Sequence, residues 1–350
     1  MSLKTACLKL LSALFLMGVA GAGYAQDRKS YQNPVIPRSI PDPTVIRLSH
    51  GVCYLYGTED IRNVPIYRSD DMVHWNFVGT AFTNETRPTF EPNGGIWAPD
   101  INYIDGKYVL YYSMSVWGGE WTCGIGVAVA DSPEGPFTDR GPLFRSNEIG
   151  VQNSIDQFYW EEKGKKYLFW GSFHGIYGIE LTDDGLAVKE GAKPRQIAGT
   201  ATEGTYIHKR NGYYYLFGSV GTCCEGANST YRTVYGRSRS LWGPYLNKRG
   251  ESMSDNKFEV LIKGNSAFVG TGHNSEFIKD DAGHDWIFYH AFPADEPDKG
   301  RVVLMDRVDW HNDWPSVERQ EPSLTNDVPV IYPRDSKGRI VRKHHRTKNR

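Results

Sequence analysis

The feature that most constrains the fold is a short aromatic strand pattern that occurs five times along this 350-residue chain. Each copy is rich in tyrosine, phenylalanine or tryptophan, and most copies follow a turn that contains glycine. The copies span residues 52–56, 108–112, 167–170, 213–217 and 286–290. Aromatic and β-branched residues favour strands, and glycine favours turns. The sequence therefore predicts a protein built from repeated short strands.

A unit of about 45–60 residues made of short strands is typical of one blade of a β-propeller. We therefore predict an all-β, five-bladed β-propeller that spans residues 32–322 as one domain. Composition agrees, because 13% of the residues are aromatic, 37 are glycine, and no long apolar helical pattern occurs outside the N-terminus. In such a ring, the equivalent position of every blade faces one central axis.

The two ends of the chain differ from this body. Residues 1–25 combine Lys4 and Lys9 with an apolar run over 10–20 and end in small residues, which is the pattern of a cleaved secretory signal. The run is too short to span a bilayer, so we expect a periplasmic or extracellular protein with no membrane span. Residues 334–350 are strongly basic and are expected to form a poorly ordered tail. The net charge is nevertheless −1, so the body is acidic, which argues against nucleic-acid binding.

Four cysteines remain after cleavage of the signal, too few in a body of this size for a disulfide framework. Cys53 lies in a strand pattern and is expected to be a buried apolar residue. Cys223 and Cys224 are neighbours that cannot easily pair with each other, so we expect them to pack locally. No cysteine or histidine spacing in the chain suits zinc.

An acid or a histidine precedes each aromatic segment. These residues are Asp42, Asp100, Asp156, Glu203 and His273. Any single acid could be a solvated turn residue, but three carboxylates at the same repeat position point to one funnel at the axis. Like charges gathered there would raise the pKa of at least one carboxyl. A protonated carboxyl beside an ionised one is the pair that glycoside hydrolysis needs.

Five short motifs make the chain resemble glycoside hydrolase family 43 over residues 32–320. They are Pro-Asp-Pro at 41–43, Trp-Ala-Pro-Asp at 97–100, Ser-Ile-Asp at 154–156, Thr-Glu-Gly at 202–204 and Gly-His-Asn at 272–274. The resemblance implies an inverting hydrolase that acts on arabinose- or xylose-containing polysaccharides. It implies that Asp42 is the general base, that Glu203 is the general acid, and that Asp156 orients the acid and tunes its pKa. Inversion requires the base and acid carboxyls to stand about 6.5–9.5 Å apart.

The resemblance also implies roles for residues beside the three acids. Trp97 stands on a proline-flanked turn, where an indole could stack on a sugar or pack between blades. Arg301 fits an arginine of the last blade that can pair with an axial carboxylate and contribute to substrate binding. His273 resembles a histidine near a central metal ion, usually calcium, although a lone histidine is a poor ligand set for calcium. Asp100 is expected to support the framework, and Gln157 departs from the family, which usually has proline there. No organic cofactor is expected.

The substrate expectation rests on residues 223–231 and 236–238, which are similar to the endo-arabinanase branch of the family. We therefore expect a monomeric enzyme that cuts α-1,5-arabinan internally. The alternatives within the family are an exo-acting α-L-arabinofuranosidase and a β-xylosidase. A non-catalytic carbohydrate-binding propeller would belong to a different class, and it has no need for Asp42, Asp156 and Glu203 together.

Overall fold

The structure, a computed structural model, describes residues 29–335 and 338–341. The predicted signal over 1–25 lies outside the described residues, as does most of the predicted tail over 334–350. Within the described part of the chain, no helix is long and apolar enough to cross a membrane. The described helices are α1 (Ser146–Ile149) and the 3-10 turns η1 (Gly226–Asn228), η2 (Met253–Asp255), η3 (Pro297–Lys299) and η4 (Glu318–Gln320).

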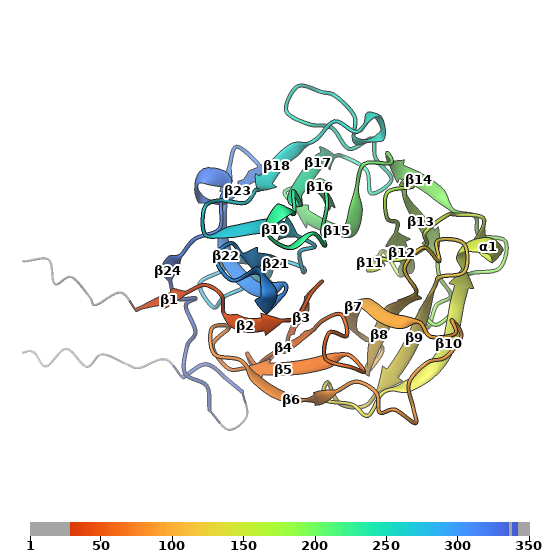
Figure 1. Ribbon diagram of the computed structural model, residues 1–350, viewed down its shortest axis with the longest axis horizontal. Coiled ribbons are helices and arrows are strands. Elements are labelled where there is room, and N and C mark those ends of the chain that lie inside the picture. The colour runs from red at the N-terminus through yellow and green to blue at the C-terminus, as the bar shows by residue number, and fades with distance from the viewer. Residues whose placement is uncertain (1–28, 336–337, 342–350) are drawn as a thin grey trace, which may run out of the picture.

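Five antiparallel sheets stand around a common centre, which confirms the predicted five-bladed β-propeller (Figure 1). Blade 1 contains β3 (Thr44–Arg47), β4 (Cys53–Tyr56), β5 (Pro65–Ser69) and β6 (Asn76–Thr80). Blade 2 contains β7 (Gly95–Ile104), β8 (Lys107–Ser115), β9 (Gly124–Ala130) and β10 (Thr138–Arg145). Blade 3 contains β11 (Phe158–Glu162), β12 (Lys165–Trp170), β13 (Ile176–Glu180) and β14 (Arg195–Ala198). Blade 4 contains β15 (Glu203–Arg210), β16 (Tyr213–Val220), β17 (Arg232–Ser238) and β18 (Glu259–Ile262).

Blade 5 is completed by a strand from the N-terminal part of the chain. Its strands are β19 (Phe268–Gly272), β21 (Asp285–Pro293), β22 (Val302–His311) and β2 (Ile36–Ser39), with β20 (Ile278–Lys279) on β21 and β23 (Trp314–Ser316) on β22. β2 pairs antiparallel with β22, so that Ile36 lies opposite Val303. A second pair joins β1 (Ser30–Gln32) to β24 (Thr325–Asp327). Hydrogen bonds between the two ends of the propeller therefore close the ring.

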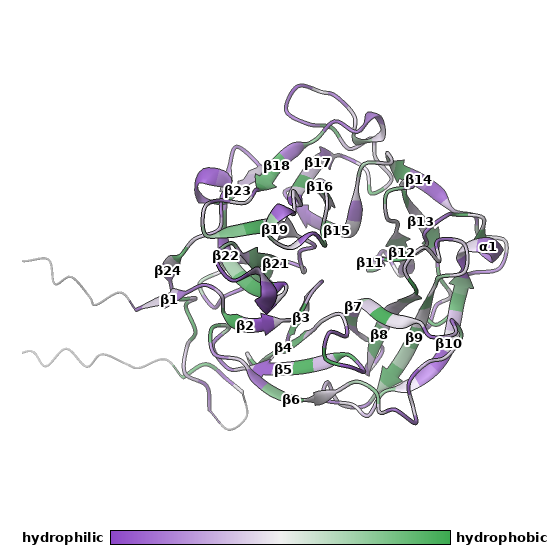
Figure 2. Ribbon diagram, in the orientation of Figure 1, coloured by the Kyte–Doolittle hydropathy of each residue, from purple (hydrophilic) through white to green (hydrophobic). Residues whose placement is uncertain are grey.

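Each predicted aromatic segment forms the second strand of its blade, namely β4, β8, β12, β16 or β21. These strands are mostly buried and hydrophobic (Figure 2). Aromatic rings pack across blade boundaries, as Trp75 of blade 1 does on Phe288 of blade 5, with ring centroids 5.6 Å apart. Cys53 is buried and unpaired, which confirms its predicted packing role. Packing between blades thus fixes where each inner strand meets the centre of the ring.

Candidate active site

All six predicted site residues line one cavity of about 360 Å³. They are Asp42, Trp97, Asp156, Glu203, His273 and Arg301. They come from all five blades, so only the closed ring brings them together. The three carboxylates are buried, while the cavity itself opens to solvent. The structure therefore places acids that are far apart in the sequence in a single site.

One backbone feature recurs beside the cavity in every blade. In each blade, one residue near the start of the inner strand is hydrogen-bonded to the aromatic strand. The residue two positions before it has a positive φ, between 42° and 68°. These five residues are Asp42, Ala98, Asp156, Gly204 and His273. The left-handed region is costly for residues other than glycine, and such strain concentrates at functional sites. The repeated bend turns one residue of each blade, or its neighbour, toward the cavity.

The places of these bends correct the prediction that the five acid or histidine positions are equivalent. Asp42, Asp156 and His273 occupy the bend itself, whereas Glu203 precedes it by one residue and Asp100 follows it by two. Asp100 does not line the cavity, and its carboxylate instead accepts a hydrogen bond from the backbone N–H of Tyr159 at 2.8 Å. Burial raises the pKa of Asp100 to about 7. Its contacts agree with a framework role and not with a place in the site.

Asp42 is surrounded by groups that favour its ionised form. Arg301 Nη1 and His273 Nδ1 each lie 3.3 Å from Asp42 Oδ1, and the hydroxyl of Thr58 donates to Oδ2 at 2.5 Å. Burial alone would raise the pKa of this carboxyl, but Arg301, His273 and His290 hold the pKa well below its usual range. Asp42 is therefore an ionised carboxylate in the free site.

His290 is a neighbour of Asp42 that the sequence did not reveal, because it belongs to the buried aromatic strand β21. The backbone N–H of Asp42 donates to Nδ1 of His290 at 3.1 Å, and that nitrogen lies 3.2 Å from Asp42 Oδ1. The ring of Tyr231 stacks on the imidazole, with centroids 5.6 Å apart and planes at 10°. Burial lowers the pKa of His290 to about 4, so this imidazole is neutral, and its Nδ1 holds the backbone of Asp42 by accepting the N–H.

Glu203 is held by two hydroxyl groups. Ser172 Oγ donates to Oε2 at 2.5 Å, and the hydroxyl of Tyr231 donates to Oε1 at 2.6 Å. Burial raises the pKa of Glu203, and the charge of Asp42 adds to the rise, although Ser172, Tyr231 and Arg301 oppose it. Neither Ser172 nor Tyr231 belongs to the motifs that point to the acid. The pKa of Glu203 is therefore raised, whereas that of Asp42 is lowered.

Asp156 has the least polar support of the three acids. Burial and the nearby charges of Glu203 and Asp42 raise its pKa well above the usual range, against the backbone N–H of Gly204 and the charge of Arg301. Its own backbone N–H donates to Ser113 Oγ at 2.9 Å. Three carboxyls in one cavity cannot all ionise freely, and the raised pKa values of Asp156 and Glu203 favour the protonated forms of these two.

Gln157, the departure from the family pattern, connects the surroundings of two acids. Ser113 Oγ, which receives the Asp156 N–H, donates to Gln157 Oε1 at 2.8 Å, and Gln157 Nε2 donates to the carbonyl of Ala98 at 2.6 Å. The N–H of Ala98 in turn donates to Thr58 Oγ1, which donates to Asp42. A side-chain amide thus does what a proline at this position could not, because proline has no hydrogen-bonding side chain.

Aromatic side chains form one wall of the cavity. Trp97 lines it and lies against Trp117, with ring centroids 5.6 Å apart. A Cβ atom at Gly95 would stand 2.3 Å from the indole nitrogen of Trp97, so glycine is needed there for this ring to lie as it does. Trp117 also lines the cavity and is 80% exposed, which is unusual for tryptophan. Trp97 therefore faces the cavity, and Trp117, which sequence motifs did not single out, extends its wall.

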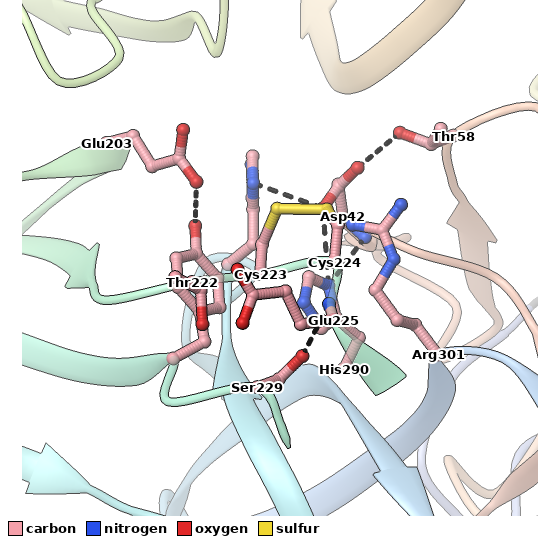
Figure 3. Close-up of a disulfide and its surroundings, with 12 residues drawn as sticks. Asp42, Thr58, Glu203, Thr222, Cys223, Cys224, Glu225, Ser229, His290 and Arg301 are labelled. Carbon is pink, nitrogen blue, oxygen red and sulfur yellow. Dashed lines mark hydrogen bonds and ion pairs between the residues drawn. A yellow bond between two sulfur atoms is a disulfide. The ribbon is translucent and has the colours of Figure 1, made fainter. Parts of the chain in front are cut away.

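A disulfide joins Cys223 to Cys224 and lines the same cavity (Figure 3). The prediction that these neighbours do not pair with each other was therefore wrong. It followed from the short distance between adjacent residues, whose Cα atoms lie 3.8 Å apart here, below the usual span of a disulfide. The pair lies in the connection between β16 and β17, residues 221–231, which also contains η1.

The residues around His273 do not fit a calcium ion held by the protein. Calcium prefers six to eight oxygen ligands, whereas Nδ1 of His273 faces Asp42. In the parts of the chain that the structure describes, no group of three histidine, cysteine, aspartate or glutamate side chains could hold a metal ion. The ion near His273 stays a prediction, and no step below is routed through it.

The family profile of the glycosyl hydrolases family 43 matches residues 31–315. An extracellular endo-α-(1→5)-L-arabinanase 1 of Bacillus subtilis is 35% identical over 79% of this chain and 86% of its own. An extracellular exo-α-(1→5)-L-arabinofuranosidase of Cellvibrio japonicus is 33% identical over 81% of this chain and 87% of its own. The solved structure of Cellvibrio cellulosa α-L-arabinanase complexed with arabinohexaose aligns with a TM-score of 0.73 at 32% identity, covering 81% of this chain and 96% of that one.

Proposed function

This chain belongs to the glycosyl hydrolases family 43 and hydrolyses glycosidic bonds, and we propose that it is an arabinan endo-1,5-α-L-arabinosidase. Arabinan-acting enzymes are prominent among its relatives, and their similarity extends over most of both chains. The observation that best supports the chemistry is the opposite shift of two carboxyl pKa values in one cavity. The pKa of Asp42 is lowered and that of Glu203 is raised.

These shifts suit the two roles of an inverting hydrolase. The ionised carboxylate of Asp42 takes a proton from a water molecule as the water oxygen bonds to the anomeric carbon. The protonated carboxyl of Glu203 gives its proton to the glycosidic oxygen as the bond between that oxygen and the anomeric carbon breaks. One sugar leaves with inverted configuration and the other with a free hydroxyl. Each turnover leaves Asp42 protonated and Glu203 ionised, so proton exchange with solvent restores the site.

Asp156 has a supporting role in this proposal. Its carboxyl shares the cavity with Glu203, whose charge raises the pKa of Asp156. The charge of Asp42 adds to the rise in the pKa of Glu203, which keeps this acid protonated before each turnover. Arg301 acts on both the base and the acid, because it pairs with Asp42 and also lowers the pKa of Glu203.

Endo action is tested by the products from linear arabinan, debranched arabinan, xylan and an aryl arabinofuranoside. Short arabino-oligosaccharides formed early from linear arabinan are the expected result. Arabinose as the sole early product would instead establish the exo-acting alternative, which the Cellvibrio japonicus relative favours. Release of xylose from xylan without action on arabinan would reject the proposed sugar while leaving the mechanism intact.

Substitution of Tyr231 by phenylalanine is expected to move the alkaline limb of the pH–rate profile to higher pH. The lost hydroxyl stabilises the ionised form of Glu203, so its removal raises the pKa of that acid. The acid works when protonated, and activity is lost as pH rises through its pKa. The matched control is Tyr235→Phe, since the hydroxyl of Tyr235 donates to the carbonyl of Pro315 and Tyr235 does not line the cavity. A limb that stays in place in Tyr231→Phe would argue against Glu203 as the acid.

Substitution of Trp117 by alanine is expected to raise KM for arabinan about tenfold, since an exposed indole offers a stacking face to a sugar ring. The value of kcat should change little, because Trp117 touches none of the three carboxylates. Trp121→Ala is the matched control, as Trp121 is 49% exposed but does not line the cavity. Equal KM values for the two variants would show that Trp117 does not bind substrate.

We further propose that the protein is exported and acts as a monomer. Two relatives are named extracellular enzymes, and disulfides such as Cys223–Cys224 persist in oxidising compartments. Cell fractionation and N-terminal sequencing of the mature protein test export, with a new N-terminus after residue 25 as the expected result. Light scattering of the purified enzyme tests the monomer.

A further inference from the structure

We infer that the Cys223–Cys224 disulfide is a substrate-binding element, an apolar wall of the cavity against which a sugar ring of the bound chain rests. The inference rests on the proposed function, because the ring is taken to belong to an α-1,5-arabinan chain. Its basis is the place of the disulfide in the site, its exposure, and the absence of a cross-linking role.

The disulfide shares the cavity with the groups proposed to carry out the reaction. Cys223 and Cys224 line it together with Asp42, Glu203 and Arg301, and Figure 3 shows the sulfur bridge among these side chains. Cys224 is exposed and Cys223 is partly exposed, whereas the two unpaired cysteines in the described residues are buried. The bridge therefore presents its surface to whatever enters the cavity.

A cross-linking role does not account for this bond. Disulfides stabilise proteins chiefly by closing a loop in the unfolded chain, and the effect grows with loop length. Here the sequence separation is one residue, so the bond closes no loop that would restrict the unfolded chain. The bond also joins no separate strands or blades.

The connection between β16 and β17 is held in place by other contacts. The N–H of Thr222 donates to Thr230 Oγ1 and the N–H of Thr230 donates to Thr222 Oγ1, both at 3.1 Å. The N–H of Glu225 donates to Ser229 Oγ at 2.9 Å, and η1 packs on β19 and η3 of blade 5. The loop therefore has its own supports on both sides of the two cysteines.

The chemistry of the bridge suits one face of a sugar. Two sulfur atoms and two methylene groups form a polarisable surface without hydrogen-bond donors, and sulfur makes favourable contacts with apolar groups. The bond also removes the rotamer freedom of both side chains, so little conformational entropy is lost on binding. The charged groups of the cavity are left to bind the sugar hydroxyls, while the bridge and the wall of Trp97 and Trp117 contact its C–H groups.

The test measures binding and not turnover. Arabinohexaose is titrated calorimetrically into the inactive Glu203→Gln protein with and without the additional pair Cys223→Ala and Cys224→Ala. Removal of the disulfide is expected to raise Kd about tenfold. Cys53→Ala in the same background is the control for cysteine removal, because Cys53 is buried in blade 1. A mild reductant should weaken binding by the parent protein, reversibly on reoxidation, and should not affect the Cys223/Cys224 variant.

Two further readouts separate a binding wall from a loop support. If the disulfide held the loop, its loss would disturb the Tyr231 hydroxyl on Glu203, so the pH–rate profile of the otherwise wild-type enzyme would shift and its Tm would fall. An unchanged Kd, or a raised Kd together with both of those shifts, overturns the inference. Cleavage of arabinan by the wild-type enzyme tests the proposed function separately. A wild-type enzyme that leaves arabinan intact would overturn both proposals.

Discussion

Replacement of Asp42 by asparagine is expected to lower kcat on linear arabinan by roughly 10³-fold or more while the propeller stays folded. The amide has nearly the same shape as the carboxylate and can still accept the Thr58 hydrogen bond. It cannot take a proton from the attacking water, so the reaction loses its base. Steady-state kinetics with arabinan as substrate measure the loss, and thermal unfolding checks that the fold survives.

The pH dependence of the wild-type enzyme gives an independent check on Asp42. A base works when ionised, so activity is present above its pKa and is lost as pH falls through that pKa. Because Arg301, His273 and His290 hold this pKa well below its usual range, the acid limb should lie below about pH 3.9, the value for an unperturbed aspartate. An acid limb near neutral pH would contradict Asp42 as the base, as would wild-type turnover by Asp42→Asn.

The opposite pKa shifts arise from what each acid has beside it. Asp42 is paired with a guanidinium and two imidazoles, whereas Glu203 has only hydroxyl partners and Asp156 is opposed by the charges of both other acids. All three acids are buried, since each stands near the start of an inner strand. The ring of blades brings the three carboxyls into one cavity, and the partners of each carboxyl determine which one holds the proton.

Much of this site follows from sequence patterns, because they record local chemistry. The aromatic second strands and the acids before them are visible as residue types at repeated positions, whereas Arg301 was implied only by the resemblance to the family. The partners of the acids are not, because Tyr231 enters from a loop and Ser172 from a single-residue bridge outside the strands. His290 looked like one more core residue of an aromatic strand. Their contacts depend on how blades stack, which no local pattern contains.

The register of the inner strands also could not be predicted from local sequence patterns. Spacing alone suggested one equivalent position for five residues, but a bulge between Trp97 and Asp100 displaces the blade-2 acid from the cavity. A similar irregularity between Glu203 and Tyr206 places Glu203 one residue before the bend. Bulges insert residues without a clear sequence signal, so acids that look equivalent in sequence reach different depths in the structure.

Replacement of Glu203 by glutamine is expected to lower kcat on arabinan by roughly 10³-fold, and far less on an arabinofuranoside with an acidic phenol as leaving group. An alkoxide leaving group needs a proton as its bond breaks, and glutamine has none to give. A dinitrophenolate leaves readily as the anion, so the general acid contributes little to its departure. The alkaline limb of the pH–rate profile should also disappear in this variant, since the group that titrates there is gone.

Glu276 offers a matched control for the loss of a carboxyl. Burial, with a contribution from Asp100, raises its pKa to about 8, so it is protonated at neutral pH, and it does not line the cavity. Glutamine in its place resembles the neutral acid, so Glu276→Gln should keep the wild-type ratio of rates on arabinan and on the dinitrophenyl substrate. Equal losses on both substrates in Glu203→Gln would mean that Glu203 acts in some way other than proton donation. A large loss on arabinan alone would identify it as the acid, because only that substrate needs the proton.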